Sequence, residues 1–112
     1  MKDIKVLKVG DKTYELCLTA KNAARVEKRI GKPILSLLNK QDEKGAQTIP
    51  TMAEIATLLS AEIISEEVDE EKALEIMDAF FDEGHNYGEI LLLITEALGF
   101  LKVAPTVVPQ AK

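Results

Sequence analysis

The sequence has a single cysteine, Cys17, so the chain cannot form an internal disulfide. Cys17 also lies far along the chain from the single histidine, His85, whereas zinc sites need a cluster of such ligands. The longest uninterrupted apolar run, Ile90 to Ile94, is much shorter than the roughly 20 residues that span a bilayer. We therefore expect no disulfide scaffold, no metal centre and no membrane-spanning segment.

Sequence motifs of known chemistry are missing as well. The chain has no glycine-rich phosphate loop, no nucleophile elbow and no His-Glu-x-x-His motif. His85 lies in a Gly-His-Asn turn, which favours a solvated residue, and no histidine motif adjoins Cys17 to activate its thiol. We predict that the protein is not an enzyme, and we assign no catalytic, cofactor-binding or metal-binding residue.

Aromatic residues are scarce, at 4% of the chain, and the isoelectric point is about 4.9. Both features argue against nucleic-acid binding. The first five residues lack the long apolar stretch of a secretory signal, and one unpaired cysteine fits a reducing compartment. We expect a cytoplasmic protein that binds neither nucleic acid nor membrane.

Apolar residues make up 46% of the chain and charged residues 29%, as in ordinary globular proteins. A chain of 112 residues can bury about two thirds of its surface around one core. We predict a single domain over residues 1–101. Residues 102–112 contain two prolines and no periodicity, which predicts a flexible tail.

Charge is divided unevenly along the chain. Residues 1–40 contain ten basic and four acidic residues, whereas residues 41–112 contain four lysines and fifteen acids. Such a division is compatible with two solvated faces, with halves that attract each other, with head-to-tail association or with a charged docking surface. The sequence alone leaves these interpretations open.

Two β-prone runs flank Gly10-Asp11 and predict a hairpin over residues 4–18 with a type II′ turn. The turn sets the register, in which the pairs are Val9 with Lys12, Leu7 with Tyr14 and Lys5 with Leu16. One face of this hairpin is apolar. Because an isolated hairpin is only marginally stable, helices must cover that face or another strand must pair with an edge.

Helical periodicity, capping residues and glycine stops follow the hairpin. Thr51 and Asn86 each precede a glutamate by three residues, which is the pattern of a capping box. We predict helices at residues 20–30, 33–39, 52–64, 70–83 and 87–98, with a long loop at 39–49. The predicted fold class is mostly α (α+β): an N-terminal hairpin followed by four to five helices in a compact domain.

Two of these helices have charged stripes that are candidate contacts for a partner. The residues are Lys21, Arg25, Lys28 and Arg29 in the 20–30 helix and Glu71, Glu75, Asp78 and Asp82 in the 70–83 helix. Leu92 is a further candidate, because it lies outside the apolar arc of the last helix. It is either a single exposed leucine or a contact with another chain, including a second copy in a homo-oligomer.

Glu27 falls inside the apolar side of the 20–30 helix, where an unpartnered carboxylate would be costly. We predict a structural role, in which Glu27 pairs with a basic side chain or accepts backbone N–H groups of the next turn. A catalytic acid is the alternative, although no second acid or histidine is in register with it.

The order and spacing of several segments resemble those of the tail assembly chaperones of long-tailed phages and prophages of Gram-positive bacteria. The resemblance rests on residues 13–20, on the Val-Glu-Lys-Arg-Ile-Gly helix end within residues 25–34, on residues 71–81 with Gly84, and on residues 87–100. In those chaperones an opening β segment precedes such a helix end, a middle helix, a long acidic helix and a closing apolar helix.

This resemblance implies a non-enzymatic chaperone that binds the tape measure protein, keeps it soluble and helps to recruit tail tube subunits. Many such chaperones have a short form and a frameshifted longer form, and none is expected in the mature virion. For such a role the charged stripes, Leu92 and the apolar set Met52, Met77, Phe80 and Phe81 are candidate contacts, because methionine adapts to irregular partners. Methionines on helix stripes are more often core residues, which is the alternative for Met52 and Met77. The alternative is a small regulatory or toxin-neutralising module that also binds a protein.

Overall fold

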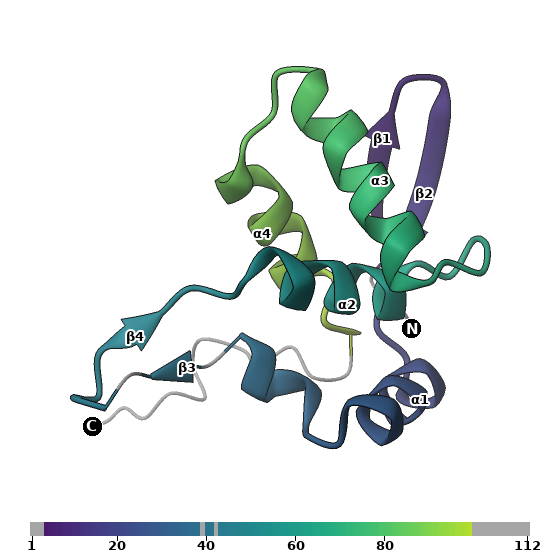
Figure 1. Cartoon of the computed structure of the whole chain (residues 1–112). Helices are drawn as coiled ribbons and strands as arrows, with labels where there is room; N and C mark the ends of the chain where they lie inside the picture. The colour runs from purple at the N-terminus through teal and green to yellow at the C-terminus, as the bar shows by residue number, and fades with distance from the viewer. Residues whose placement is uncertain (1–3, 39, 42, 100–112) are drawn as a thin grey trace, which may run out of the picture.

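The structure is a computed structural model that describes residues 4–38, 40–41 and 43–99 (Figure 1). Its elements are β1 (Lys5–Val9), β2 (Lys12–Leu16), α1 (Ala20–Ile30), the 3-10 helix η1 (Ile34–Leu37), β3 (Lys40–Gln41), β4 (Gln47–Thr48), α2 (Met52–Glu62), α3 (Glu70–Asp82) and α4 (Tyr87–Glu96). The predicted fold class, a hairpin followed by helices, is confirmed. The tail predicted at residues 102–112 lies outside the described residues.

The hairpin has the predicted register, in which Val9 pairs with Lys12, Leu7 with Tyr14 and Lys5 with Leu16. Gly10 has a positive φ of 59°, whereas Asp11, like every other described residue that is not glycine, does not. This is the φ pattern of a type II′ turn. The apolar face of the hairpin is buried, whereas Val6 on the opposite face is exposed.

A second strand-like segment covers the outer edge of β2. Leu16 forms an isolated antiparallel bridge with Ile63, and the N–H of Ile64 donates to the carbonyl of Glu15 at 2.9 Å. This contact explains why α2 ends at Glu62, because the chain must become extended to reach β2. The hairpin is thereby fastened to the end of α2.

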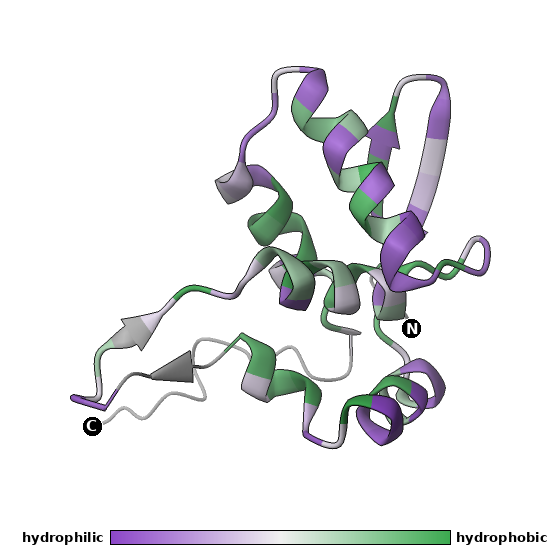
Figure 2. Cartoon of the chain, viewed as in Figure 1, coloured by the Kyte–Doolittle hydropathy of each residue, from purple (hydrophilic) through white to green (hydrophobic). Residues whose placement is uncertain are grey.

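Helix α2 lies in the middle of the molecule, with the hairpin and α3 on one side and α1 with η1 on the other (Figure 1). Seven of its eleven residues are buried, and Figure 2 shows that hydrophobic residues predominate along it. Its buried apolar residues belong to one core cluster, which also contains residues of the hairpin, α1, η1, α3 and α4: Leu7, Leu16, Val26, Ile34, Met77, Phe80, Ile90 and Ile94. Burial of each large side chain stabilises the fold by about 1.5–3 kcal/mol.

The predicted capping boxes are present at α2 and α4. The N–H of Thr51 donates to Glu54 Oε1 at 2.9 Å, and the N–H of Glu54 donates back to Thr51 Oγ1. Asn86 and Glu89 exchange the same pair of hydrogen bonds. No helix of the described residues is long and apolar enough to cross a membrane.

Several predicted boundaries were wrong. The 33–39 helix is a 3-10 helix of four residues, because Pro33 keeps an extended conformation with ψ 146°. The helices predicted to end at residues 64, 83 and 98 end instead at Glu62, Asp82 and Glu96. Within the predicted 39–49 loop, β3 and β4 form a short antiparallel ladder. This ladder could not be predicted, because the segment has no alternation of apolar and polar residues.

The chain packs closely against itself at Gly99. The N–H of Leu18 donates to the carbonyl of Ala97 at 2.8 Å, which fastens the end of α4 beside the segment after β2. A Cβ atom at Gly99 would overlap the carbonyl oxygen of Leu18, and Gly99 has φ 59°. Only glycine fits this position without a shift of the chain.

We predict that Gly99→Ala lowers the free energy of unfolding by more than Gly31→Ala does. Both glycines have a positive φ, which costs an alanine about 1–2 kcal/mol. A Cβ at Gly31, however, has no atom within 4 Å. Urea denaturation measures both losses, and equal losses would show that the overlap with Leu18 has no energetic weight.

Candidate protein-interaction site

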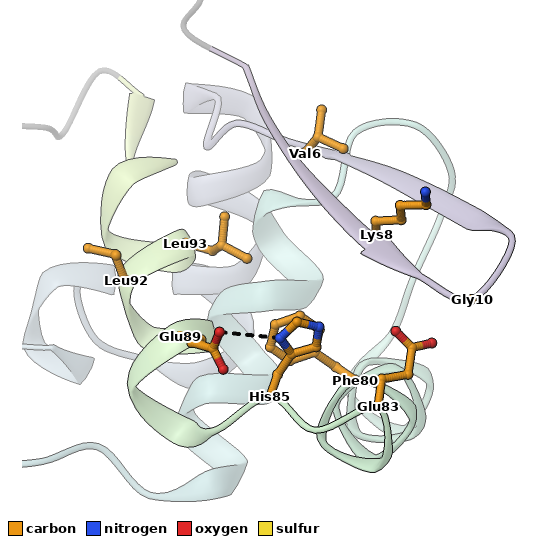
Figure 3. A pocket seen from close by; sticks show the side chains of 9 residues that line it. All are labelled: Val6, Lys8, Gly10, Phe80, Glu83, His85, Glu89, Leu92 and Leu93. Atoms are coloured by element: carbon orange, nitrogen blue, oxygen red, sulfur yellow. Dashed lines mark hydrogen bonds and ion pairs between the residues drawn. The ribbon is translucent and has the colours of Figure 1, made fainter.

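A groove lies between β1 and α4, with a volume of about 480 Å³ (Figure 3). We call it the edge groove. Its lining comes from three parts of the chain: Val6, Lys8 and Gly10 in the hairpin, Phe80, Glu83 and His85 around the end of α3, and Glu89, Leu92 and Leu93 in α4.

The rings of Phe80 and His85 lie together in the middle of the edge groove (Figure 3). They stack with centroids 4.2 Å apart and an angle of 12° between their planes. His85 Nδ1 lies 3.3 Å from Glu89 Oε2, and the N–H of Asn86 donates to Glu89 Oε1 at 2.7 Å. The Asn86 N–H and, after it, the His85 ring hold the pKa of Glu89 below its ordinary value. His85 is therefore half-buried and oriented, rather than a simple solvated turn residue.

Two exposed apolar side chains line the edge groove, one from β1 and one from α4. Val6 is 53% exposed and Leu92 is 58% exposed, although they come from opposite ends of the sequence. Leu92 is therefore on the surface rather than in the core, and a second exposed apolar residue lines the same groove.

A second groove of about 390 Å³ lies between η1, residues 48–50 and α4. We call it the apolar groove, because apart from two threonines its lining is apolar: Leu35, Leu38, Thr48, Ile49, Pro50, Leu91, Thr95 and Leu98. Ile49 is 71% exposed, the largest exposed fraction among the large apolar residues of the described part. The two grooves lie on different faces of α4.

The apolar set considered as partner contacts, Met52, Met77, Phe80 and Phe81, lies partly in the core and partly on the surface. Met77 and Phe80 are buried, and Phe81 is partly buried against the core. Only Met52, at the start of α2, keeps a largely exposed side chain. Of this set, Met52 is thus the residue most available to a partner.

The basic stripe of α1 faces acidic residues of the same chain. Arg29 forms an ion pair with Glu70, in which Arg29 Nη1 lies 3.1 Å from Glu70 Oε1. Lys21 and Arg25 line a depression together with Glu66 and Glu67, whereas Lys28 is exposed. Part of the charge division is therefore attraction between two halves of one molecule, and exposed pairs of this kind contribute at most about 1 kcal/mol each.

The acidic stripe of α3 has no such counterpart. Glu71, Glu75, Asp78 and Asp82 are all exposed, and none forms an ion pair within the described residues. These four carboxylates are therefore available to a partner.

Glu27 accepts a backbone hydrogen bond, as the sequence predicts. The N–H of Ile34 donates to Glu27 Oε2 at 2.9 Å. Glu27 thereby provides a hydrogen-bond acceptor for the backbone N–H of the first residue of η1 and joins this turn to α1. This is a structural role.

Glu62 is a buried polar residue that the sequence did not lead us to expect. Its side chain is fully buried, and neither carboxylate oxygen has a hydrogen-bond partner among the described residues. Burial raises the pKa of Glu62 well above 4.5. Glu62 comes seven residues after Ile55, and residues seven apart share one face of a helix. This spacing could have indicated that Glu62 is buried.

A protein-family model matches residues 1–103, which is nearly the whole chain. The chain belongs to a family of unknown function, DUF6096. No curated protein and no solved structure matches it significantly.

The described residues contain no group of three or more His, Cys, Asp or Glu side chains placed to hold a metal ion. Each groove of the DUF6096 chain has exposed apolar side chains beside a helix or a strand.

We predict that Glu62→Gln makes the free energy of unfolding less dependent on pH. Because the folded state raises the pKa of Glu62, the stability from this group is fully present below about pH 4.5 and is lost as the pH rises through the raised pKa. The wild type should therefore weaken relative to the variant as the pH rises.

Thermal unfolding of both proteins across the acid and neutral range measures this effect. A difference in stability that stays constant at every pH would contradict a buried, protonated Glu62.

Proposed function

We propose that the protein is a non-enzymatic tail assembly chaperone that binds the tape measure protein, keeps it soluble and helps to recruit tail tube subunits. It acts in the cytoplasm of the host cell and is absent from the mature virion. The proposal combines the resemblance described above with one structural observation, the apolar groove beside α4.

The apolar groove supports a helical client. An amphipathic helix has one apolar stripe, and a groove of leucine, isoleucine and proline side chains buries such a stripe. Leu35 and Ile49 expose apolar surface there that no described residue covers. Burial of a fully exposed side chain of this size contributes about 1.5–3 kcal/mol, and Ile49, which is 71% exposed, has more of this area left to bury than Leu35, which is 38% exposed.

The acidic stripe of α3 supports the same role in a different way. The chain has a net charge of −5, and the exposed acids of α3 add repulsion between copies that expose apolar grooves. They also favour the approach of a basic client. A chaperone needs both properties, since its binding surface must be apolar and its free form must stay soluble.

Co-expression with a tape measure protein tests this proposal. We expect the wild type to increase the soluble fraction of the tape measure protein and to co-purify with it. Ile49→Lys should remove the increase, because it places a charge in the apolar groove. Since Ile49 is largely exposed, this variant should unfold within a few degrees of the wild type.

Ile4→Lys is the matched control, because Ile4 is also exposed but lies outside the apolar groove. It should behave as the wild type does. The proposal fails if the wild type leaves the tape measure protein insoluble, or if Ile49→Lys is as effective as the wild type. Neutralisation of a toxin with no effect on the tape measure protein would favour the alternative, a regulatory module.

A further inference from the structure

We propose that the outer edge of β1 binds an extended segment of another polypeptide, which adds a third strand to the hairpin and places apolar and basic side chains in the edge groove (Figure 3). This site is separate from the apolar groove. The inference goes beyond the proposed function and does not require the tape measure protein as the partner.

The hairpin register shows which backbone groups point outward. In a hairpin with a two-residue turn, the residues that flank the turn exchange hydrogen bonds, and bonded and non-bonded pairs alternate from there. Val9 and Lys12 flank the turn. The N–H and C=O groups of Val6 and Lys8 therefore point away from β2, toward the outer edge of β1.

The hydrogen bonds of β2 support this assignment. Glu15, the partner of Val6, directs its backbone groups away from β1: its carbonyl accepts from Ile64, and its N–H donates to Ser65 Oγ at 3.1 Å. Residues 63–65 thus occupy the outer edge of β2. At the outer edge of β1, no described residue from outside the hairpin forms a hydrogen bond with Val6 or Lys8.

The unpaired edge opens onto a hollow. Val6 and Lys8, whose backbone groups point outward, are the β1 residues that line the edge groove. A strand with free N–H and C=O groups is a template for another strand, and main-chain hydrogen bonds then supply much of the affinity. The groove provides room for the alternate side chains of the added strand.

The groove also determines the chemistry of that strand. Leu92 and Leu93 provide apolar surface on the α4 side, which favours an apolar side chain. Glu83 and Glu89 add two carboxylates, and Glu83 has no ion pair within the described residues. The remaining titratable groups are His85, which contacts Glu89, and Lys8, whose side chain extends away from Glu83 (Figure 3). A basic side chain in the bound segment would face the two carboxylates.

A second copy of the chain is a poorer occupant than a different polypeptide. The sequence of β1, Lys-Val-Leu-Lys-Val, contains two lysines and no acid. Pairing of two β1 strands would gather four lysines on one ribbon, and like charges on paired strands are destabilising.

The test is a titration of the isotope-labelled protein with an end-blocked peptide, Val-Thr-Lys-Thr-Val-Thr-Lys, followed by NMR. Alternate positions of this probe are valine or lysine, and threonine between them favours a strand. We expect the amide signals of Val6 and Lys8 to shift and their hydrogen exchange to slow about tenfold or more. A peptide with glutamate in place of lysine should bind at least fivefold more weakly.

Proline substitutions distinguish edge pairing from other binding. Val6→Pro removes an N–H that points outward and should abolish binding while the hairpin remains, because its ladder does not use this group. Thr13→Pro is the matched control, since it removes an outward N–H from β2 instead, and it should bind as the wild type does.

If Val6→Pro does not fold, a charge reversal at Glu83 tests the proposal instead. Glu83→Lys should weaken the lysine peptide and strengthen the glutamate peptide. Unchanged amides of Val6 and Lys8, equal binding by Val6→Pro, or a dimer that Val6→Pro dissociates would each overturn the proposal.

Discussion

The antiparallel contact between residues 15–17 and residues 62–65 holds the hairpin against the end of α2. Three hydrogen bonds form it: Cys17 N–H to Glu62 O at 2.8 Å, Ile64 N–H to Glu15 O at 2.9 Å, and Glu15 N–H to Ser65 Oγ at 3.1 Å. The contact ends α2, places the hairpin over the central helix and leaves β1 as the open edge. It also draws Glu62 into the interior, where its carboxyl has no partner among the described residues.

The position of α4 follows from a second backbone contact and creates both grooves. Leu18 holds Ala97 through a hydrogen bond, and Gly99 permits the close passage of the chain beside Leu18. With its end held there, α4 contacts β1, and its residues Ile90 and Ile94 are buried in the core. One flank of α4 then faces β1 and the other faces η1, so a single helix borders a site for an extended strand and a site for an apolar stripe.

Much of the fold could be predicted because its signals are local. Gly10-Asp11 and the alternation around it determine the hairpin register, and the Thr51 and Asn86 capping boxes determine two helix starts. The backbone hydrogen bond of Glu27 also follows from its place on an apolar helix face.

The candidate sites could not be predicted in the same way, because they depend on contacts between distant parts of the chain. Periodicity marks Leu92 as exposed but does not show that Val6 lies across a groove from it. The stripe containing Arg29 is evident from the sequence, whereas its partner Glu70 is not. Glu62 shares a helix face with Ile55, but only the packed structure shows that no described neighbour forms a hydrogen bond with its carboxyl.

We propose that this protein acts by presenting grooves to another polypeptide. Hydrogen exchange of the chain, measured alone and with a bound polypeptide client, tests this proposal. We expect added protection in β1, in residues 48–50 and in α4, with α1 unchanged. Protection confined to the charged faces of α1 and α3, or protection nowhere, would overturn it.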